Sequence, residues 1–356
     1  MVDPRFGRAA ATALIFFTLE GSVFRTGVYR SVLDPDSAAG TVLGYLDSER
    51  ARAKRGKQIL VIGDSRTGFL ARAANRPAPE TGFTFGSIVV PGTTLRAWYY
   101  MLREVDPHAN RYAAIVLPTE NYEDEDYSDQ AEMADVHYLA ALVPLAGLPA
   151  YALSFPTWER RWEAFLGGLL KGYAYRRDFQ DFLVHHKARM RRIATVRAGF
   201  ARWIYDAEWG TASLAGLRVD WTARKITFPE GVTPRMRQLI EERLLRPDPP
   251  PTGEQAAYRR LWFGRIIDRY RGSPTRLVFI CLPRGPVVAP PSPIQRTSTI
   301  REFARFPHVI LAPEHLFDEL EMPALFGDPM HLNGAGGDRF STILAREVPR
   351  LLARPR

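Results

Sequence analysis

The hydrophobic pattern of the chain alternates between two periods over residues 58–117. Short aliphatic and β-branched runs are separated by segments of helical periodicity, and no hairpin turn signal joins the runs. The runs predict strands over 58–63, 83–90 and 112–117, and the segments predict helices over 67–74 and 95–105. Strands that alternate with helices need crossover connections, so this region predicts a parallel sheet in an α/β fold.

The alternation stops near residue 123 and resumes near residue 277. Residues 123–270 are mostly helical in pattern and rich in Trp, Tyr, Phe and Arg, whereas 277–282 and 308–311 again predict strands. A last helix is expected over about 337–352. We therefore expect one α/β domain over residues 46–356, interrupted by a large, mostly helical insertion over 123–270, and not two domains in series.

Residues 1–45 are expected to form a separate N-terminal segment. Arg5 and Arg8 precede an apolar run from Ala9 to Leu19, as a basic region precedes the apolar core of a secretory signal. Glu20 interrupts the run, and no clean cleavage site follows it. The segment predicts a signal anchor and a cell-envelope location, membrane-anchored or periplasmic. The alternative is an amphipathic or buried helix in a cytoplasmic protein.

Composition excludes several classes of protein. The 356 residues are 46% hydrophobic and 24% charged, which is not the composition of a disordered or collagen-like chain. No apolar stretch reaches the roughly 18 uninterrupted residues of a spanning helix, so a multi-span membrane protein is excluded. The net charge of +9 is compatible with an anionic partner: nucleic acid, a membrane surface or an acidic polymer.

Much of that charge lies in one part of the predicted insertion. Residues 159–205 hold eleven Lys or Arg and four acidic residues, a local net charge of +7. Arginines at 189, 191, 192, 197 and 202 alternate with apolar residues at helical spacing. A solvated Arg face over a packed apolar face explains the pattern, and contact with an anionic surface or glycan is the alternative. A nucleic-acid partner is not expected, because no recognised binding module accompanies the segment.

Cysteine and histidine give no metal signal. Cys281 lies in an apolar run and is expected to be an inert core thiol. His185 and His186 are adjacent, so on a helix they point to different faces. We expect no metal and no other cofactor.

The segment Gly63-Asp64-Ser65-Arg66 follows the first predicted strand directly. A serine at this point can project its hydroxyl from the carboxyl edge of the sheet, with its own N–H available to a developing oxyanion. The competing interpretation is a helix N-cap, in which Asp64 or Ser65 accepts backbone N–H groups.

A second candidate segment, Asp328-Pro329-Met330-His331, follows the last predicted strand. An aspartate three residues before a histidine in a tight turn can hold the imidazole in one tautomer and orientation, as a general base requires. The competing interpretation is a polar loop at the entry of a helix.

Two further turns follow strands at the same predicted edge. Gly92 follows the second strand and can offer its N–H, and Asn121 follows the third strand and can offer its side-chain amide. With Ser65, Asp328 and His331, these residues make up a complete acyl-transfer set: a nucleophile, a base held by an acid, and donors for a negative oxygen.

The order Gly63-Asp64-Ser65, Gly92, Asn121 and Asp328-x-x-His331 resembles the SGNH (GDSL) hydrolase superfamily over residues 58–122 and 275–352. The resemblance implies a flavodoxin-like three-layer α/β/α sandwich. It further implies that Ser65 is the nucleophile, that His331 is the general base and that Asp328 orients His331. The oxyanion hole is then formed by Ser65, Gly92 and Asn121. The third block departs from the usual pattern, because Tyr122 follows Asn121. The ending Asp-x-x-His-Leu-Asn-x-x-Gly and the basic-apolar N-terminus are similar to cell-envelope O-acyltransferase-like proteins such as alginate acetylation proteins.

The expected function is serine-dependent acyl transfer by an esterase or an O-acyltransferase. Its substrate is expected to be a small acyl ester or an envelope polysaccharide, and the family branch suggests a membrane-embedded acyl-donor partner. The alternative is a non-catalytic SGNH-like scaffold whose basic, aromatic insertion holds an anionic glycan or a membrane partner. The two interpretations differ in geometry, because only the enzyme needs His331 Nε2 beside Ser65 Oγ and Asp328 on the other ring nitrogen.

Overall fold

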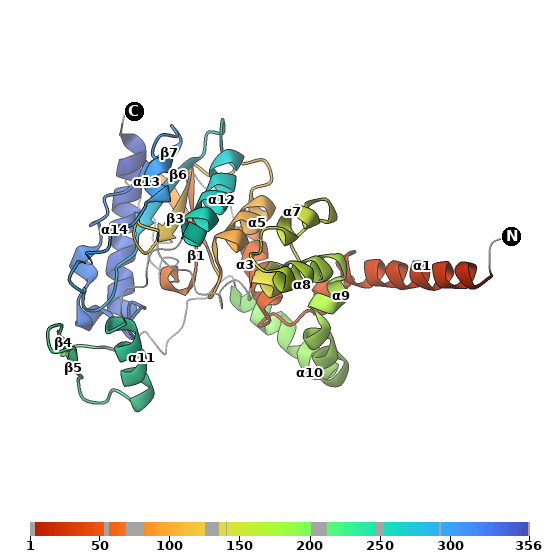
Figure 1. Ribbon diagram of the computed structural model, residues 1–356, viewed down its shortest axis with the longest axis horizontal. Coiled ribbons are helices and arrows are strands. Elements are labelled where there is room, and N and C mark those ends of the chain that lie inside the picture. Colours follow the sequence, from red (N-terminus) through yellow and green to blue (C-terminus); the bar gives the residue numbers. More distant parts are fainter. Residues whose placement is uncertain are drawn as a thin grey trace. The chain divides into compact units, whose positions relative to one another are not determined.

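The computed structural model describes residues 4–52, 57–68, 82–124, 135–139, 141–200, 212–246, 253–291 and 293–354. The chain divides into two compact units (Figure 1). Unit 1 comprises Met1–Ser48 and Asp129–Arg202, and unit 2 comprises Glu49–Ser128 and Trp203–Arg356.

Unit 2 is built on a five-stranded, all-parallel sheet, which confirms the predicted α/β class. The sheet order is β2-β1-β3-β6-β7. The strands are β1 (Lys57–Gly63), β2 (Phe83–Val89), β3 (Ala114–Thr119), β6 (Arg276–Cys281) and β7 (Val309–Leu311). β1, β3 and β6 are buried almost throughout, as expected of parallel strands covered on both faces.

Helices pack on both faces of this sheet. On one face, Phe340 of α14 (Gly334–Ala353) shares a core with Val61 and Val278. On the other face, Phe263 of α12 (Gly253–Arg269) contacts Phe279 with ring centroids 4.9 Å apart, and α12 packs on α5 (Leu95–Val105). Successive strand residues point to opposite faces of a sheet. Val278 therefore faces the layer that contains α14, and Phe279 faces the layer that contains α12.

The predicted strands and helices of the sheet region lie within three residues of the observed ones. The predicted helix over 67–74 is the exception: its start is a 3₁₀ turn, η1 (Ser65–Thr67), and its positions after 68 lie outside the described residues.

The predicted insertion, residues 123–270, is divided between the two units. Its second part belongs to unit 2 and includes the hairpin β4 (Arg218–Asp220) and β5 (Lys225–Thr227) and helix α11 (Pro234–Leu244). Ile226 and Ile240 of these elements join the same core as α14. Such short strands with single buried residues leave no periodic signal, and for this reason the sequence predicted no strand within the mostly helical insertion. Three short elements complete unit 2: α13 (Thr299–Phe303), η3 (Asp318–Leu320) and η4 (Pro323–Leu325).

Unit 1 contains the N-terminal segment and the first part of the predicted insertion. Its elements are α1 (Pro4–Phe24), α2 (Val28–Val32), α3 (Ala38–Ala51), which crosses the unit boundary, η2 (Leu145–Gly147), α7 (Leu148–Ala152), α8 (Trp158–Leu169), α9 (Lys171–Ala174) and α10 (Arg176–Phe200). Glu20 is buried and accepts the backbone N–H groups of Lys171 and Gly172 at the start of α9. No helix in the described part of the chain combines the length and the apolar character needed to cross a membrane.

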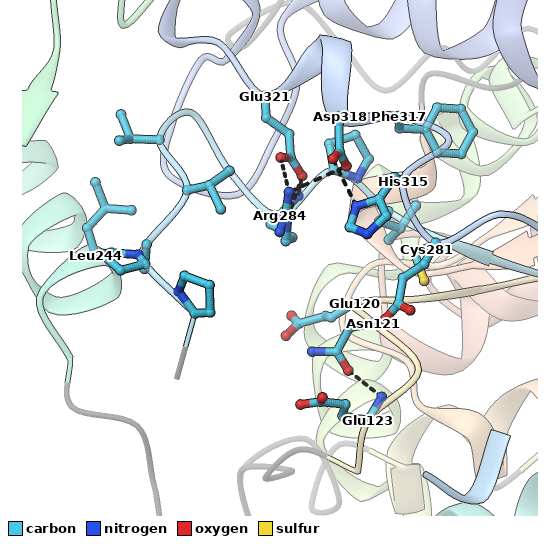
Figure 2. Close-up of a pocket in the computed structure, with 18 of the residues that line it drawn as sticks. Glu120, Asn121, Glu123, Leu244, Cys281, Arg284, His315, Phe317, Asp318 and Glu321 are labelled. Carbon is cyan, nitrogen blue, oxygen red and sulfur yellow. Dashed lines mark hydrogen bonds and ion pairs between the residues drawn. The ribbon is translucent and has the colours of Figure 1, made fainter. Parts of the chain in front are cut away.

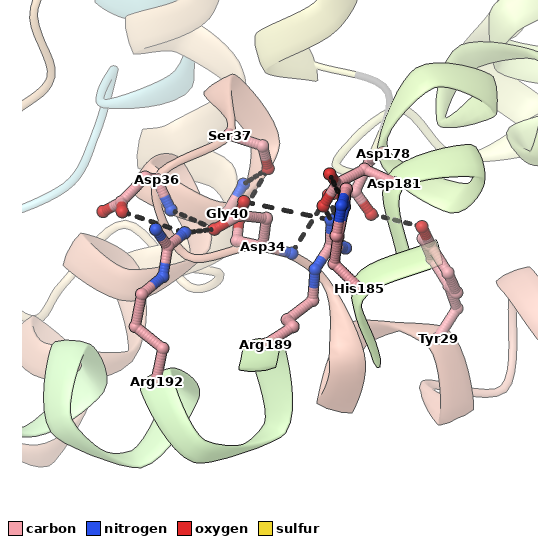
Figure 3. A network of polar contacts seen from close by, with 10 residues as sticks. All are labelled: Tyr29, Asp34, Asp36, Ser37, Gly40, Asp178, Asp181, His185, Arg189 and Arg192. Atoms are coloured by element: carbon pink, nitrogen blue, oxygen red, sulfur yellow. Dashed lines mark hydrogen bonds and ion pairs between the residues drawn. The ribbon is translucent and has the colours of Figure 1, made fainter. Parts of the chain in front are cut away.

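Ion pairs fix α10 to the segment between α2 and α3 (Figure 3). Arg189 is 4% exposed and pairs with Asp178 at 2.9 Å, with Asp181, and with Asp34 at 3.9 Å. The expected solvated face is therefore wrong at Arg189, and Met190, expected on the packed face, is 52% exposed. One of the aspartates that bury Arg189, Asp34, lies about 150 positions away in the chain. Helical periodicity cannot reveal such a partner.

Candidate active site

Ser65 is held at the carboxyl end of β1 by close packing. A Cβ added at Gly63 would lie 2.4 Å from Thr67 Oγ1 and 3.0 Å from Pro118 Cγ, so only glycine allows the turn to close this tightly. Asp64 caps the turn, because its carboxylate accepts the Arg66 N–H at 3.0 Å. The capping role, left open between Asp64 and Ser65 by the sequence, belongs to Asp64.

The segment from Leu325 to Asn333 closes on itself and fixes the histidine. Phe326 and Leu332 form an isolated antiparallel bridge, and the Gly327 N–H donates to the His331 carbonyl at 3.0 Å. Asn333 caps α14 by accepting the Gly336 N–H at 3.0 Å. Asn333 and Gly336, the Asn and the last Gly of the Asp-x-x-His-Leu-Asn-x-x-Gly ending, therefore have structural roles here.

These two rigid turns bring three predicted residues together. Ser65 Oγ lies 2.8 Å from His331 Nε2, and His331 Nδ1 lies 2.7 Å from Asp328 Oδ2. Asp328 Oδ1 accepts the backbone N–H groups of Met330 and His331, both at 2.6 Å. Asp328 and His331 are 4% and 7% exposed, whereas Ser65 is half-buried.

The hydrogen bonds define what this arrangement can do. Asp328 Oδ1 accepts two backbone N–H groups, as suits a carboxylate, which only accepts, so the contact of Oδ2 with His331 needs its donor on the ring. Nδ1 of His331 then carries the imidazole proton, and the lone pair of Nε2 is directed at the Ser65 hydroxyl. A serine with a base on its hydroxyl, and an acid orienting that base, is the arrangement that activates an oxygen nucleophile.

Gly92 and Asn121 lie in the turns after the two strands that flank β1. Gly92 is exposed and has a φ of 71°, a left-handed conformation that glycine adopts without strain. Asn121 Oδ1 accepts the Glu123 N–H at 2.8 Å, which fixes the direction of its side-chain amide. Since β2, β1 and β3 are neighbours in a parallel sheet, the turns of Gly92, Ser65 and Asn121 share one edge.

A cavity of about 470 Å³ lies along this edge on the β3–β6–β7 side (Figure 2). Arg66 and Asn121 line it, together with residues that the sequence did not single out, among them Glu120, Trp221, Arg243, Arg284 and Glu321. They come from segments far apart in the chain, and no local motif marks them.

Cys281 also lines the cavity, but it is 4% exposed. Burial, reinforced by the charge of Glu314, raises the pKa of its thiol to about 12. At neutral pH the group is a thiol and a poor nucleophile, in agreement with the expected inert core cysteine.

Metal ligands are not assembled in the described parts of the chain. No group of three or more His, Cys, Asp or Glu residues there could hold an ion. His185 instead pairs with Asp181 at 2.8 Å on the surface of α10.

Comparison with known proteins adds no assignment: no protein-family model matches the chain, and no curated protein matches its sequence.

Proposed function

We propose that unit 2 is an SGNH-type serine esterase or O-acyltransferase acting on an acyl ester or an envelope polysaccharide. The observation that carries the proposal is the continuous hydrogen-bonded series from Ser65 Oγ through His331 to Asp328. It is the geometry that a catalytic enzyme needs and that a scaffold has no reason to maintain.

The sheet topology supports the same interpretation. Counted along the sheet alone, the strands run 2-1-3-4-5, the order of flavodoxin-like folds. The strand order reverses between β1 and β3, and ligands of open α/β sheets bind outside the carboxyl ends at such a reversal. Ser65 follows β1, and Asn121 follows β3.

The reaction follows from the roles of the side chains. Ser65 Oγ bonds to the acyl carbonyl carbon while its proton passes to His331 Nε2, and Asp328 stabilises the imidazolium that forms. The N–H groups of Ser65 and Gly92 and the Asn121 amide are assigned to the carbonyl oxygen, which becomes negative. His331 then protonates the departing alcohol. Water or a sugar hydroxyl next attacks the acyl-serine and gives its proton to His331, and His331 returns this proton to Ser65 Oγ as the acyl–oxygen bond breaks.

The scaffold alternative relies on a free basic face in α10, and two of its arginines are already paired. Arg189 and Arg192 contact the aspartates at positions 34, 36, 178 and 181, which neutralise their charge locally. Ionic attraction from these two arginines to an anionic glycan is correspondingly reduced.

A serine-directed fluorophosphonate tests the assignment of the nucleophile. Wild-type protein should be labelled, Ser65→Ala should not, and Ser213→Ala, which removes an exposed hydroxyl of the same unit, should be labelled as wild type. Labelling of Ser65→Ala at the wild-type level would show that another residue is the nucleophile.

We infer in addition that α1 attaches the protein to a membrane of the cell envelope. Leu14, Ile15, Phe16, Phe17 and Leu19 are all at least half exposed. The apolar stretch from Ala9 to Leu19 is about 16 Å long at 1.5 Å per residue, roughly half of the 30 Å hydrocarbon core. It therefore matches insertion into one leaflet.

Flotation with anionic liposomes tests this attachment. Replacing Leu14, Phe16 and Phe17 of α1 by Asn should prevent flotation of the full chain. The same change at the exposed residues Leu239 and Leu261 of unit 2 should not affect flotation. Equal flotation of both variants would contradict an attachment through α1.

A further inference from the structure

The lining of the cavity at the sheet edge does not include Ser65 or His331, but it includes the residue next to the proposed nucleophile. Arg66 follows Ser65 directly, and Glu120 and Asn121 follow β3. The opposite parts of the wall come from the segment after β6, from the region around η3, and from α11. Its volume, about 470 Å³, is within the range of small-molecule sites.

The charged groups at the Ser65 end are paired with each other. Glu120 forms ion pairs with both Arg66 and Arg243, the latter at 3.1 Å. Arg66 also contacts Asp64 at 3.2 Å. Arg243 belongs to α11, so Glu120 joins that helix to the residue next to Ser65.

The charged groups farther along the wall are paired in the same way (Figure 2). Arg284 forms two side-chain hydrogen bonds to Glu321, at 2.6 and 2.8 Å, and contacts Asp318 at 3.4 Å. The other lining residues include two further arginines, Arg246 and Arg296, and two further glutamates, Glu123 and Glu314, so arginines and carboxylates balance in the lining. Apolar side chains, Trp221, Leu244 and Val287 among them, also line the wall.

Such a lining discriminates between ligand chemistries. An arginine that already binds carboxylates offers less attraction to an anionic ligand, and the carboxylates repel one. A guanidinium has five N–H donors and a carboxylate about four acceptor positions, so a pair such as Arg284 and Glu321 can also donate to and accept from a ligand. A hydroxyl group is both donor and acceptor, so it can bond to either member of a pair. Apolar side chains can cover the C–H faces of a sugar ring.

We propose that this cavity binds an uncharged carbohydrate chain and presents one of its hydroxyl or acyl-ester groups to Ser65. The inference rests on the acyl-transfer function proposed above and narrows its substrate to neutral glycans. Arg243 and Trp221 are assigned as specificity-determining residues, one through hydrogen bonds and the other through contact with a sugar face.

Binding is measured by calorimetry on the full chain carrying Ser65→Ala, which prevents turnover. The neutral probes are cellohexaose, maltohexaose and chitohexaose in its N-acetylated form, and the anionic probe is hexagalacturonate, at low salt. At least one neutral chain should bind at least tenfold more tightly than the uronate. Tighter binding of the uronate, or no binding of any neutral chain, would overturn the inference.

Two variants test the assigned residues in the same background. Arg243→Gln and Trp221→Ala should each weaken binding of the neutral chain by about tenfold, the effect of losing one strong hydrogen bond or one aromatic contact. Arg235→Gln removes the same charge from an exposed position of α11 outside the cavity and should leave binding unchanged. Thermal melts check that each variant is folded. Unchanged binding in both cavity variants, or an equal loss in Arg235→Gln, would contradict the assignment.

The two proposals can fail separately. If Ser65 of the wild-type protein is labelled by the fluorophosphonate but no neutral chain binds, the function stands and the cavity inference is wrong. If neutral chains bind as expected but Ser65 is not labelled, the cavity binds carbohydrate without acyl transfer at Ser65.

Discussion

Each unit holds a histidine whose Nδ1 lies within hydrogen-bond distance of an aspartate. The distance is 2.7 Å for His331 and Asp328 in unit 2, and 2.8 Å for His185 and Asp181 in unit 1. The surroundings differ. The side chain of His331 is 9% exposed, with Ser65 on its other ring nitrogen, whereas that of His185 is 64% exposed.

The aspartates differ as well. Asp328 accepts two backbone N–H groups from its own turn and contacts His331 Nδ1, and no arginine or lysine in the described residues forms an ion pair with it. Asp181 shares its charge with the buried Arg189. The aspartate–histidine distance alone therefore does not identify a catalytic pair. Two features distinguish a catalytic pair from a structural ion pair: the histidine is buried, and its other ring nitrogen, Nε2, contacts a hydroxyl group.

Removing the two histidines should give the largest contrast. His331→Ala should lower ester hydrolysis by up to about 10⁶-fold, because the nucleophile then lacks its base. His185→Ala should leave the rate unchanged. Single-turnover kinetics with an activated ester measure both. Comparable losses in the two variants would mean that the site is assigned to the wrong unit.

Asp328→Asn should have the second-largest effect on the rate. An amide at this position favours the wrong histidine tautomer, and a loss of about 10⁴-fold is expected, although the fold should be kept. Asp181→Asn is the matched change in unit 1 and should not affect hydrolysis. A loss below tenfold in Asp328→Asn would mean that Asp328 does not orient the base.

Arg189→Met should affect stability and not chemistry. It leaves Asp34, Asp178 and Asp181 without their buried partner, which costs about 3–5 kcal/mol of unfolding free energy. Arg192 also pairs with aspartates but its side chain is half exposed, so Arg192→Met should cost at most about 1 kcal/mol. Urea unfolding monitored by circular dichroism measures both. Equal costs would contradict the structural role assigned to Arg189.

Cys281→Ala should have the smallest effect. With the pKa of the thiol raised to about 12, little thiolate exists at pH 7.5, so the rate of ester hydrolysis should stay within about twofold of wild type. A loss comparable with that of His331→Ala would make Cys281 a rival nucleophile beside Ser65.

The sequence predicted the sheet because parallel strands covered on both faces appear as uninterrupted apolar runs. It pointed to Ser65 because this residue follows a strand closely, and to Asp328 and His331 because they form a short motif just before the last helix. The contacts of Arg189 with Asp34 and of Glu20 with Lys171 could not be predicted, since the two residues of each pair lie more than 150 positions apart in the chain. The division into units and the cavity wall depend on the same kind of long-range contact.

The assignment of Ser65 as the nucleophile is tested most sharply by intact-mass analysis after brief incubation with p-nitrophenyl acetate and an acid quench. Wild-type protein should gain the mass of one acetyl group, peptide mapping should place it on Ser65, and His331→Ala should gain none. An acetyl group on another residue, or hydrolysis of the ester that proceeds equally in Ser65→Ala, would contradict acyl transfer through Ser65.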